Sequence, residues 1–168
     1  MIMDEVSYGK ILHIDGDKRY SEKADRYYKK AGLKAIVKNI PERRQPHVIG
    51  SLLQKYKPDI LVITGHDSMI RKGTRFYDLY NYKNSKYFIK TVEEARKQDL
   101  KKNLAIFAGA CQSYYEGIMF AGANFASSPA RILIDFMDPI RVAEKIAITP
   151  ANQFITIKDL EPELRDGQ

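Results

Sequence analysis

Short, almost continuously apolar runs separated by amphipathic segments are the feature that most constrains the fold of this sequence. Residues 60–64 (ILVIT) and 104–108 (LAIFA) are apolar at nearly every position, as in strands that are covered on both faces of a sheet. Such strands belong to parallel sheets, because parallel strands are joined by helices that cross the sheet. The pattern predicts an α/β fold with a mostly parallel sheet and helices on both of its faces.

The rest of the chain continues this alternation of strand and helix patterns. Tyr20, Ala24 and Tyr27, for example, recur at the spacing of one helix face. A polar stretch, 65–84, separates the third strand from the next helix. We predict further strands at 10–15, 34–37, 124–127 and 154–157, and helices at 17–31, around 49–56, around 88–95, at 112–121 and at 138–146.

The length and composition indicate a single domain covering residues 1–168. The chain has 28 Lys and Arg against 21 Asp and Glu, a net charge of +7, and 44% hydrophobic residues, which exclude disordered and fibrous proteins. One cysteine excludes an intramolecular disulfide, and no segment has the layout of a signal peptide or the roughly 20 apolar residues of a membrane helix. We therefore expect a soluble protein of a reducing compartment.

Chemically active residues follow several of the predicted strands. In parallel sheets, ligands and catalytic groups gather where the strands end at the carboxyl edge. The third strand is followed by His66 and the fourth by Cys111. If these strands are neighbours, about 4.8 Å apart, the two side chains share one crevice. The segments that follow the first, third, fourth and fifth strands are 13–17 (HIDGD), 64–67 (TGHD), 109–113 (GACQS) and 126–129 (ASSP).

A thiol beside an imidazole is suited to the hydrolysis of amides. We expect Cys111 to act as the nucleophile and His66 to give a proton to the leaving amine. Cys111 precedes the predicted helix at 112–121, and the positive end of a helix dipole favours the thiolate. The backbone N–H groups of Asp67 and Cys111 could hold the oxyanion that develops in the reaction. This chemistry requires no metal and no cofactor.

The order of the two residues along the chain supports the same chemistry. Cys111 follows His66 after about 45 residues, and 109–113 nearly matches the caspase signature Q-A-C-[RQG]-G, which has a histidine about 50 residues upstream. In this layout the histidine follows one strand and the cysteine follows the next. The sequence therefore resembles the caspase-like cysteine peptidases, and the resemblance implies their fold.

Five segments between residues 11 and 132 show a closer resemblance. ILHIDGD, KPDILVITGHD, NYKNSKYF, FAGACQS and AGANFASSPARI resemble the YabG family, the sporulation-specific proteases of endospore-forming bacteria. The resemblance implies an endopeptidase that processes spore coat and related proteins, cuts after basic residues, Arg above all, and can cut itself. Because family members tend to be longer, we expect the chain to represent their catalytic core. The implied location is the cytoplasm of the sporulating cell, with association with the spore coat.

An enzyme that cuts after arginine needs a carboxylate to receive the guanidinium group. Asp15, at the end of the first strand, is our candidate for this pocket, and the rival carboxylates are Asp67, Glu116 and Asp138. Gln112 lies beside the cysteine and is a further candidate for substrate binding. Ser127 and Ser128 resemble the stretch after the fifth strand that pairs with the substrate backbone in caspase-like enzymes.

Other polar residues have simpler interpretations. His13 lies within an apolar strand and His47 within a predicted helix, so we expect a core histidine and a surface histidine. Asp17 is expected only to cap the helix that follows it. The basic residues 71–75 lie in the long polar stretch, where they could form a self-cleavage site or a lid. Because basic residues are scattered over every predicted helix, we expect no nucleic-acid partner; the expected partners are protein substrates.

Two alternatives are compatible with parts of the sequence. KILHIDGD and KPDILVITGHD are similar to the first and third strands of receiver-like signalling modules, which would bind without catalysis. That fold requires a lysine at the end of the fifth strand, where Ser127 stands, and it leaves Cys111 unexplained. Residues 109–113 also approach the nucleophile turn of glutaminase-type hydrolases, but in those enzymes the cysteine precedes its histidine.

Overall fold

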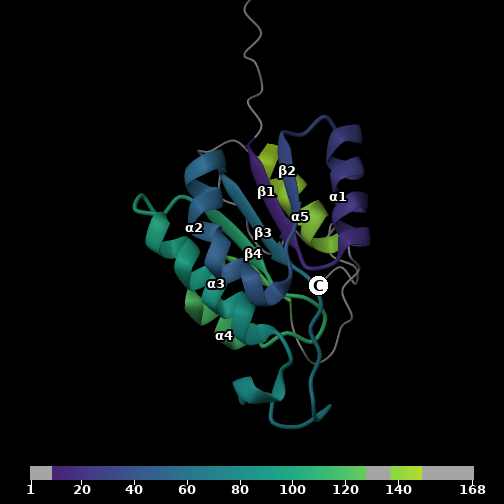
Figure 1. Ribbon diagram of the computed structural model, residues 1–168, viewed down its shortest axis with the longest axis vertical. Helices are drawn as coiled ribbons and strands as arrows, with labels where there is room; N and C mark the ends of the chain where they lie inside the picture. The colour runs from purple at the N-terminus through teal and green to yellow at the C-terminus, as the bar shows by residue number, and fades with distance from the viewer. Residues whose placement is uncertain (1–8, 128–136, 149–168) are drawn as a thin grey trace, which may run out of the picture.

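The fold is built on a five-stranded sheet in which every described strand pair is parallel. The computed structural model describes residues 9–127 and 137–148 (Figure 1). The strand order is β2-β1-β3-β4-β5, so the predicted α/β fold with a parallel sheet is confirmed. That residues 1–168 form a single domain stays a prediction. The strands are β1 (Ile11–Asp15), β2 (Ala35–Asn39), β3 (Ile60–Thr64), β4 (Ala105–Ala108) and β5 (Phe125–Ala126).

Helices cover both faces of this sheet, as Figure 1 shows. Helices α1 (Lys18–Lys30) and α5 (Met137–Ile148) pack on one face. The opposite face is covered by α2 (Gln45–Tyr56), α3 (Ser85–Gln98) and α4 (Tyr115–Ala121). Two short 3-10 turns, Glu42–Arg44 and Leu79–Asn81, complete the described elements.

Alternation along the strands supplies the core on each face. On β3, Leu61 and Ile63 point to the α2–α3 face, where Phe88 of α3 is fully buried. Val62 points to the other face and packs in the same cluster as Tyr28 of α1. Both faces of the strand are covered, so all five residues of β3 are buried, including the polar Thr64 at its end.

Most predicted elements are present with shifted ends. The helix predicted at 112–121 begins only at Tyr115, because Gln112 adopts a left-handed conformation with φ 62° and interrupts helical geometry. The strand predicted at 124–127 is limited to Phe125–Ala126. The helix predicted at 138–146 is α5, whereas the strand predicted at 154–157 lies outside the described residues.

The long segment between β3 and α3 is anchored by the carboxylate of Asp67. This carboxylate accepts hydrogen bonds from Ser85 Oγ, from Ser113 Oγ at 2.9 Å, and from the backbone N–H groups of Asn84 at 2.7 Å and Ser68 at 2.9 Å. It thereby joins the end of β3 to the start of α3 and to the turn after β4. Burial raises the pKa of Asp67 above its ordinary value, so the carboxylate depends on these donors for its stabilisation.

Replacing this carboxylate should destabilise the fold. Asp67→Ala leaves four partly buried donors without their acceptor, and we expect a loss of roughly 2–4 kcal/mol in the free energy of unfolding. Urea denaturation followed by circular dichroism measures the change. Asp25→Ala is the matched control, because Asp25 forms an exposed ion pair with Lys29 on α1, and its expected effect is below about 0.5 kcal/mol. Equal stability of the two variants would contradict the anchoring role.

Candidate active site

The carboxyl ends of β1, β3 and β4 meet at one edge of the sheet. Asp15 pairs with Thr64 across β1 and β3, and Ile63 pairs with Ala108 across β3 and β4. A cavity of about 180 Å³ opens at this edge. The residues that line it are Asp15, Tyr20, Thr64, Gly65, His66, Asp67, Gly109, Ala110, Cys111 and Pro139. The neighbouring strands thus place His66 and Cys111 around the same cavity.

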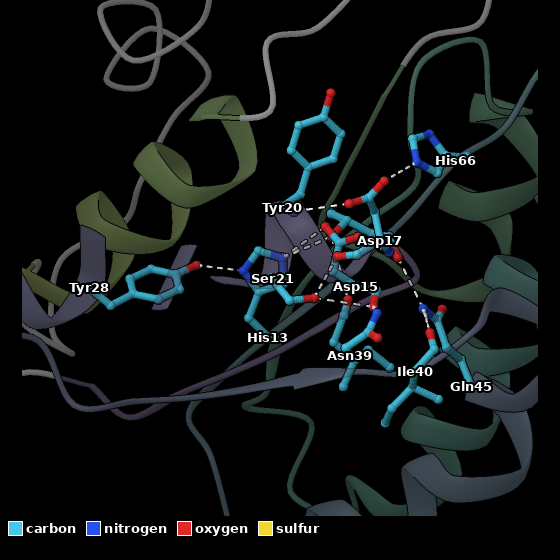
Figure 2. A network of polar contacts seen from close by, with 12 residues as sticks. His13, Asp15, Asp17, Tyr20, Ser21, Tyr28, Asn39, Ile40, Gln45 and His66 are labelled. Carbon is cyan, nitrogen blue, oxygen red and sulfur yellow. Dashed lines mark hydrogen bonds and ion pairs between the residues drawn. The ribbon is translucent and has the colours of Figure 1, made fainter. Parts of the chain in front are cut away.

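His66 lies on an exposed loop, yet its backbone and its ring both have partners. Its side chain is 61% exposed. The backbone N–H donates to Glu42 Oε1 at 3.3 Å, and the carbonyl accepts from Asn84 Nδ2 at 2.8 Å. The ring Nε2 lies 2.6 Å from Asp17 Oδ2, as Figure 2 shows. The ring of Tyr20, another cavity residue, is centred 5.9 Å from the imidazole.

Asp17 caps α1, as the sequence predicts, and it also contacts His66. Its Oδ1 accepts the N–H of Tyr20 at 3.0 Å and so caps α1 as expected. The prediction that capping is its only role is wrong, because Oδ2 contacts His66. The hydrogen bond from His66 is the main reason that the pKa of Asp17 lies below its ordinary value. A residue 49 positions before His66 cannot be recognised as its partner from spacing alone.

Cys111 lies in a turn and not at the start of a helix. Helix α4 begins four residues later at Tyr115, so the expected contribution of a helix dipole to the thiol is not supported. The turn is held by Ser113, whose hydroxyl accepts the N–H of Ala110 at 2.8 Å and donates to Asp67. Gly109 has φ 110°, and a Cβ there would lie 3.1 Å from Ile118 Cδ1, so a glycine is needed at this bend.

Asp15 is the buried carboxylate of the cavity. It is 6% exposed, and it accepts from Thr64 Oγ1 and from the backbone N–H of Asp17, both at 2.7 Å. Burial is the main cause that raises its pKa above the ordinary value. Among the described residues, each oxygen of Asp15 has one hydrogen-bond donor, and a carboxylate oxygen can accept a second hydrogen bond.

His13 supports this carboxylate from within the sheet, as a core histidine. Since Thr64 Oγ1 donates to Asp15, the same oxygen accepts from His13 Nε2 at 2.8 Å. Tyr28 then donates its hydroxyl proton to His13 Nδ1 at 2.9 Å (Figure 2). Burial lowers the pKa of His13 to about 3, so the ring is neutral. The prediction that His13 is a satisfied core residue is confirmed.

The other carboxylates proposed for the arginine pocket are placed differently. The carboxylate of Asp67 is occupied by its four donors, although its residue lines the cavity. Glu116 is exposed on α4 and is absent from the cavity lining. The side chain of Asp138 lies outside the described residues. Of the two carboxylates that line the cavity, Asp15 is therefore the one that can still accept further hydrogen bonds.

Of the remaining substrate-binding candidates, the two that the structure describes, Gln112 and Ser127, do not line this cavity. Gln112 accepts the N–H of Met69 through Oε1 at 3.4 Å and so contacts the loop after β3. Ser127 is buried directly after β5, and its hydroxyl has no hydrogen-bond partner within the described part of the chain. Ser128 lies outside the described residues, and His47 is exposed on α2 as predicted. The roles of Gln112, Ser127 and Ser128 stay predictions.

The basic segment 71–75 is exposed along its whole length. The buried Asn81 holds it in place, because its Nδ2 donates to the carbonyls of Arg71 at 3.2 Å and Thr74 at 2.7 Å. Self-cleavage or lid movement of this segment stays a prediction.

Within residues 9–127 and 137–148, no group of three or more His, Cys, Asp or Glu side chains is arranged to hold a metal ion. No helix in these ranges is long and apolar enough to cross a membrane.

Comparisons with known proteins agree with the resemblance seen in the sequence. The family described as YabG peptidase U57 matches residues 5–164. The chain is also 45% identical over 150 residues to the sporulation-specific protease YabG of Bacillus subtilis (strain 168). This alignment covers 89% of the chain and 52% of the relative, so the chain spans about half the length of that protein. From the extent of the family match, we conclude that the chain belongs to the YabG peptidase U57 family.

Proposed function

We propose that this chain is a caspase-like cysteine endopeptidase in which Cys111 is the nucleophile and His66 is the general acid and base. The observation that supports the proposal is that both side chains line one cavity at the ends of the neighbouring strands β3 and β4. The family match supports peptide-bond hydrolysis as the reaction. The proposal includes no cofactor and no metal.

The reaction divides into two steps. The thiol proton of Cys111 passes to His66, Sγ attacks the peptide carbonyl carbon, the C–N bond breaks, and His66 donates this proton to the departing amine. A water molecule then attacks the thioester that remains. His66 takes a proton from this water, the C–S bond breaks, and the proton returns from His66 to Sγ. Each step passes through a tetrahedral intermediate whose oxygen bears the negative charge.

Backbone N–H groups stabilise this oxyanion in the proposed mechanism. The N–H of Asp67 has no acceptor among the described residues and belongs to a residue that lines the cavity. The N–H of Cys111 is the second proposed donor. Two donors fixed by the ends of strands need no reorganisation when the charge develops, which is the usual source of this kind of catalysis.

The proposed specificity is for a basic residue, Arg above all, before the cut bond. The guanidinium group would bind Asp15, whose buried carboxylate retains acceptor capacity at the cavity. Gln112, Ser127 and Ser128 are proposed to contact the substrate. We propose spore coat and related proteins as substrates, because the relative from Bacillus subtilis is named a sporulation-specific protease. Cleavage of the chain itself, and a location in the cytoplasm of the sporulating cell with coat association, belong to the same proposal.

The strand order alone does not distinguish a peptidase from a receiver-like module. The order 2-1-3-4-5 also occurs in doubly wound signalling proteins. Receiver-like chemistry would need a lysine at the end of β5, where Ser127 stands, and it would leave Cys111 at the cavity unexplained. The site and the family match therefore favour the peptidase.

The function is tested with fluorogenic peptides that differ only in the residue before the cut bond. We expect cleavage after Arg that iodoacetamide abolishes, and Cys111→Ala should lower the rate by at least about a thousandfold without unfolding the protein. Because Cys111 is the single cysteine, alkylation reports on this thiol alone. Ser51→Ala, an exposed change on α2, is the control. Retained activity of Cys111→Ala would exclude the mechanism.

The acid–base role is tested by comparing two histidines. His66→Ala should lower kcat by roughly a hundredfold or more, because the leaving amine then lacks its proton donor. His47→Ala removes an exposed histidine of α2 that is absent from the cavity lining, and it should leave kcat unchanged. Steady-state kinetics on the best Arg peptide separate kcat from KM. Equal kcat values for the two variants would remove His66 from the mechanism.

The specificity pocket makes a pH-dependent prediction. Asp15→Asn should lower the turnover of Arg peptides at least about tenfold, because the charged partner of the guanidinium is lost. The raised pKa of Asp15 means that its carboxylate gains a proton at a higher pH than an ordinary aspartate. For the wild type, KM for Arg peptides should therefore rise as the pH falls through that raised value. An unchanged rate in Asp15→Asn, with Asp25→Asn as control, would assign the pocket elsewhere.

A further inference from the structure

We propose that Asp17 is a positioning residue that fixes the orientation and tautomer of the His66 imidazole. The inference rests on the proposed function, because it adds a third group to the Cys111–His66 pair. The observation behind it is the contact of 2.6 Å between His66 Nε2 and Asp17 Oδ2, at a ring that is otherwise 61% exposed (Figure 2).

The backbone contacts of His66 leave its ring unrestrained, so the ring depends on a contact of its own. Its backbone is held on one side by Glu42, which accepts the N–H, and on the other by Asn84, which donates to the carbonyl. Gly16 and Gly65 leave room for Glu42, since a Cβ at either glycine would collide with its carboxylate. With the backbone fixed and the side chain exposed, rotation about the side-chain bonds is the freedom that remains. The contact with Asp17 restricts that rotation.

Asp17 is itself held on a rigid support. Its backbone N–H donates to Asp15 Oδ1 at 2.7 Å, and its Oδ1 caps α1 through Tyr20 N–H. Asp15 is tied in turn to Thr64 at the end of β3. The position of Oδ2 is therefore set by β1, β3 and the first turn of α1. Such a support is what a precise orientation of a neighbouring ring requires.

The contact also selects the tautomer of His66. An ionised carboxylate only accepts hydrogen bonds, so the Nε2–H of the imidazole is the donor. The lowered pKa of Asp17 keeps this carboxylate ionised at neutral pH. Nδ1 then has the lone pair with which a neutral imidazole accepts a proton. A histidine that serves a thiol needs this nitrogen unprotonated at the start of the reaction.

Two substitutions separate positioning from capping. Asp17→Asn keeps Oδ1 for the cap but replaces Oδ2 by an amide that cannot accept from Nε2–H. Asp17→Ser also keeps a capping oxygen and removes the group that reaches the ring. We expect both variants to retain the thermal stability of the wild type, with kcat lowered at least about tenfold and KM changed less than about threefold. Asp25→Asn, on the same helix, is the control and should match the wild type.

A second measurement does not depend on turnover. The chain has three histidines, so long-range ¹H–¹⁵N spectra of the neutral imidazoles can be assigned with His47→Ala and His66→Ala. We expect His66 of the wild type to have its proton on Nε2, and Asp17→Asn to move population to the Nδ1–H form. A loss of kcat without this tautomer change would mean that Asp17 acts through structure alone and would overturn the inference.

The outcomes distinguish this inference from the proposed function. If the wild type shows no cleavage that depends on Cys111, the peptidase proposal fails and the catalytic role of Asp17 fails with it. If the wild type cleaves and Cys111→Ala does not, but Asp17→Asn and Asp17→Ser have wild-type kcat, only the positioning role is overturned. Lowered kcat in both variants, together with the tautomer change, supports it.

Discussion

The parallel pairing of β1, β3 and β4 is the constraint on which the site depends. Because the three strands run in the same direction and in register, their carboxyl ends lie at one edge of the sheet. The segments that leave this edge contain Asp17, His66 and Cys111. An antiparallel pairing of neighbouring strands would instead place their carboxyl ends at opposite edges of the sheet.

A buried polar network links this edge to the core. Tyr28, His13, Thr64 and Asp15 form a continuous series of hydrogen bonds across α1, β1 and β3. Burying polar groups costs free energy unless each has a partner, and each of these does. The neutral His13 avoids a buried cation, and the carboxylate of Asp15 keeps its two donors. The network therefore supports the site, and because His13 is neutral it adds no buried positive charge.

The sequence predicted the cavity residues better than the interactions between them. The continuous apolar strands predicted a parallel sheet. Because His66 and Cys111 follow two consecutive strands, the sequence also predicted that both lie at the carboxyl edge of that sheet. The contact of Asp17 with His66 was missed because helix capping already explained an aspartate immediately before α1. The helix dipole expected at Cys111 was wrong because the left-handed Gln112 delays α4 to Tyr115. Propensity patterns do not reveal such a turn, since glutamine rarely adopts positive φ.

By itself, the sequence determined the α/β class, the strands and helices that build it, the family, and which residues lie at the ends of the strands. These follow from local periodicity and from motifs, which any reader of the chain can recognise. Only the tertiary structure decided that Asp17 contacts His66, that Asp67 uses its carboxylate to anchor a loop, and that Asp15 faces the cavity. These contacts join residues 17 to 49 positions apart, and hydrogen bonds at such separations depend on the path of the loops in space and not on any spacing along the chain.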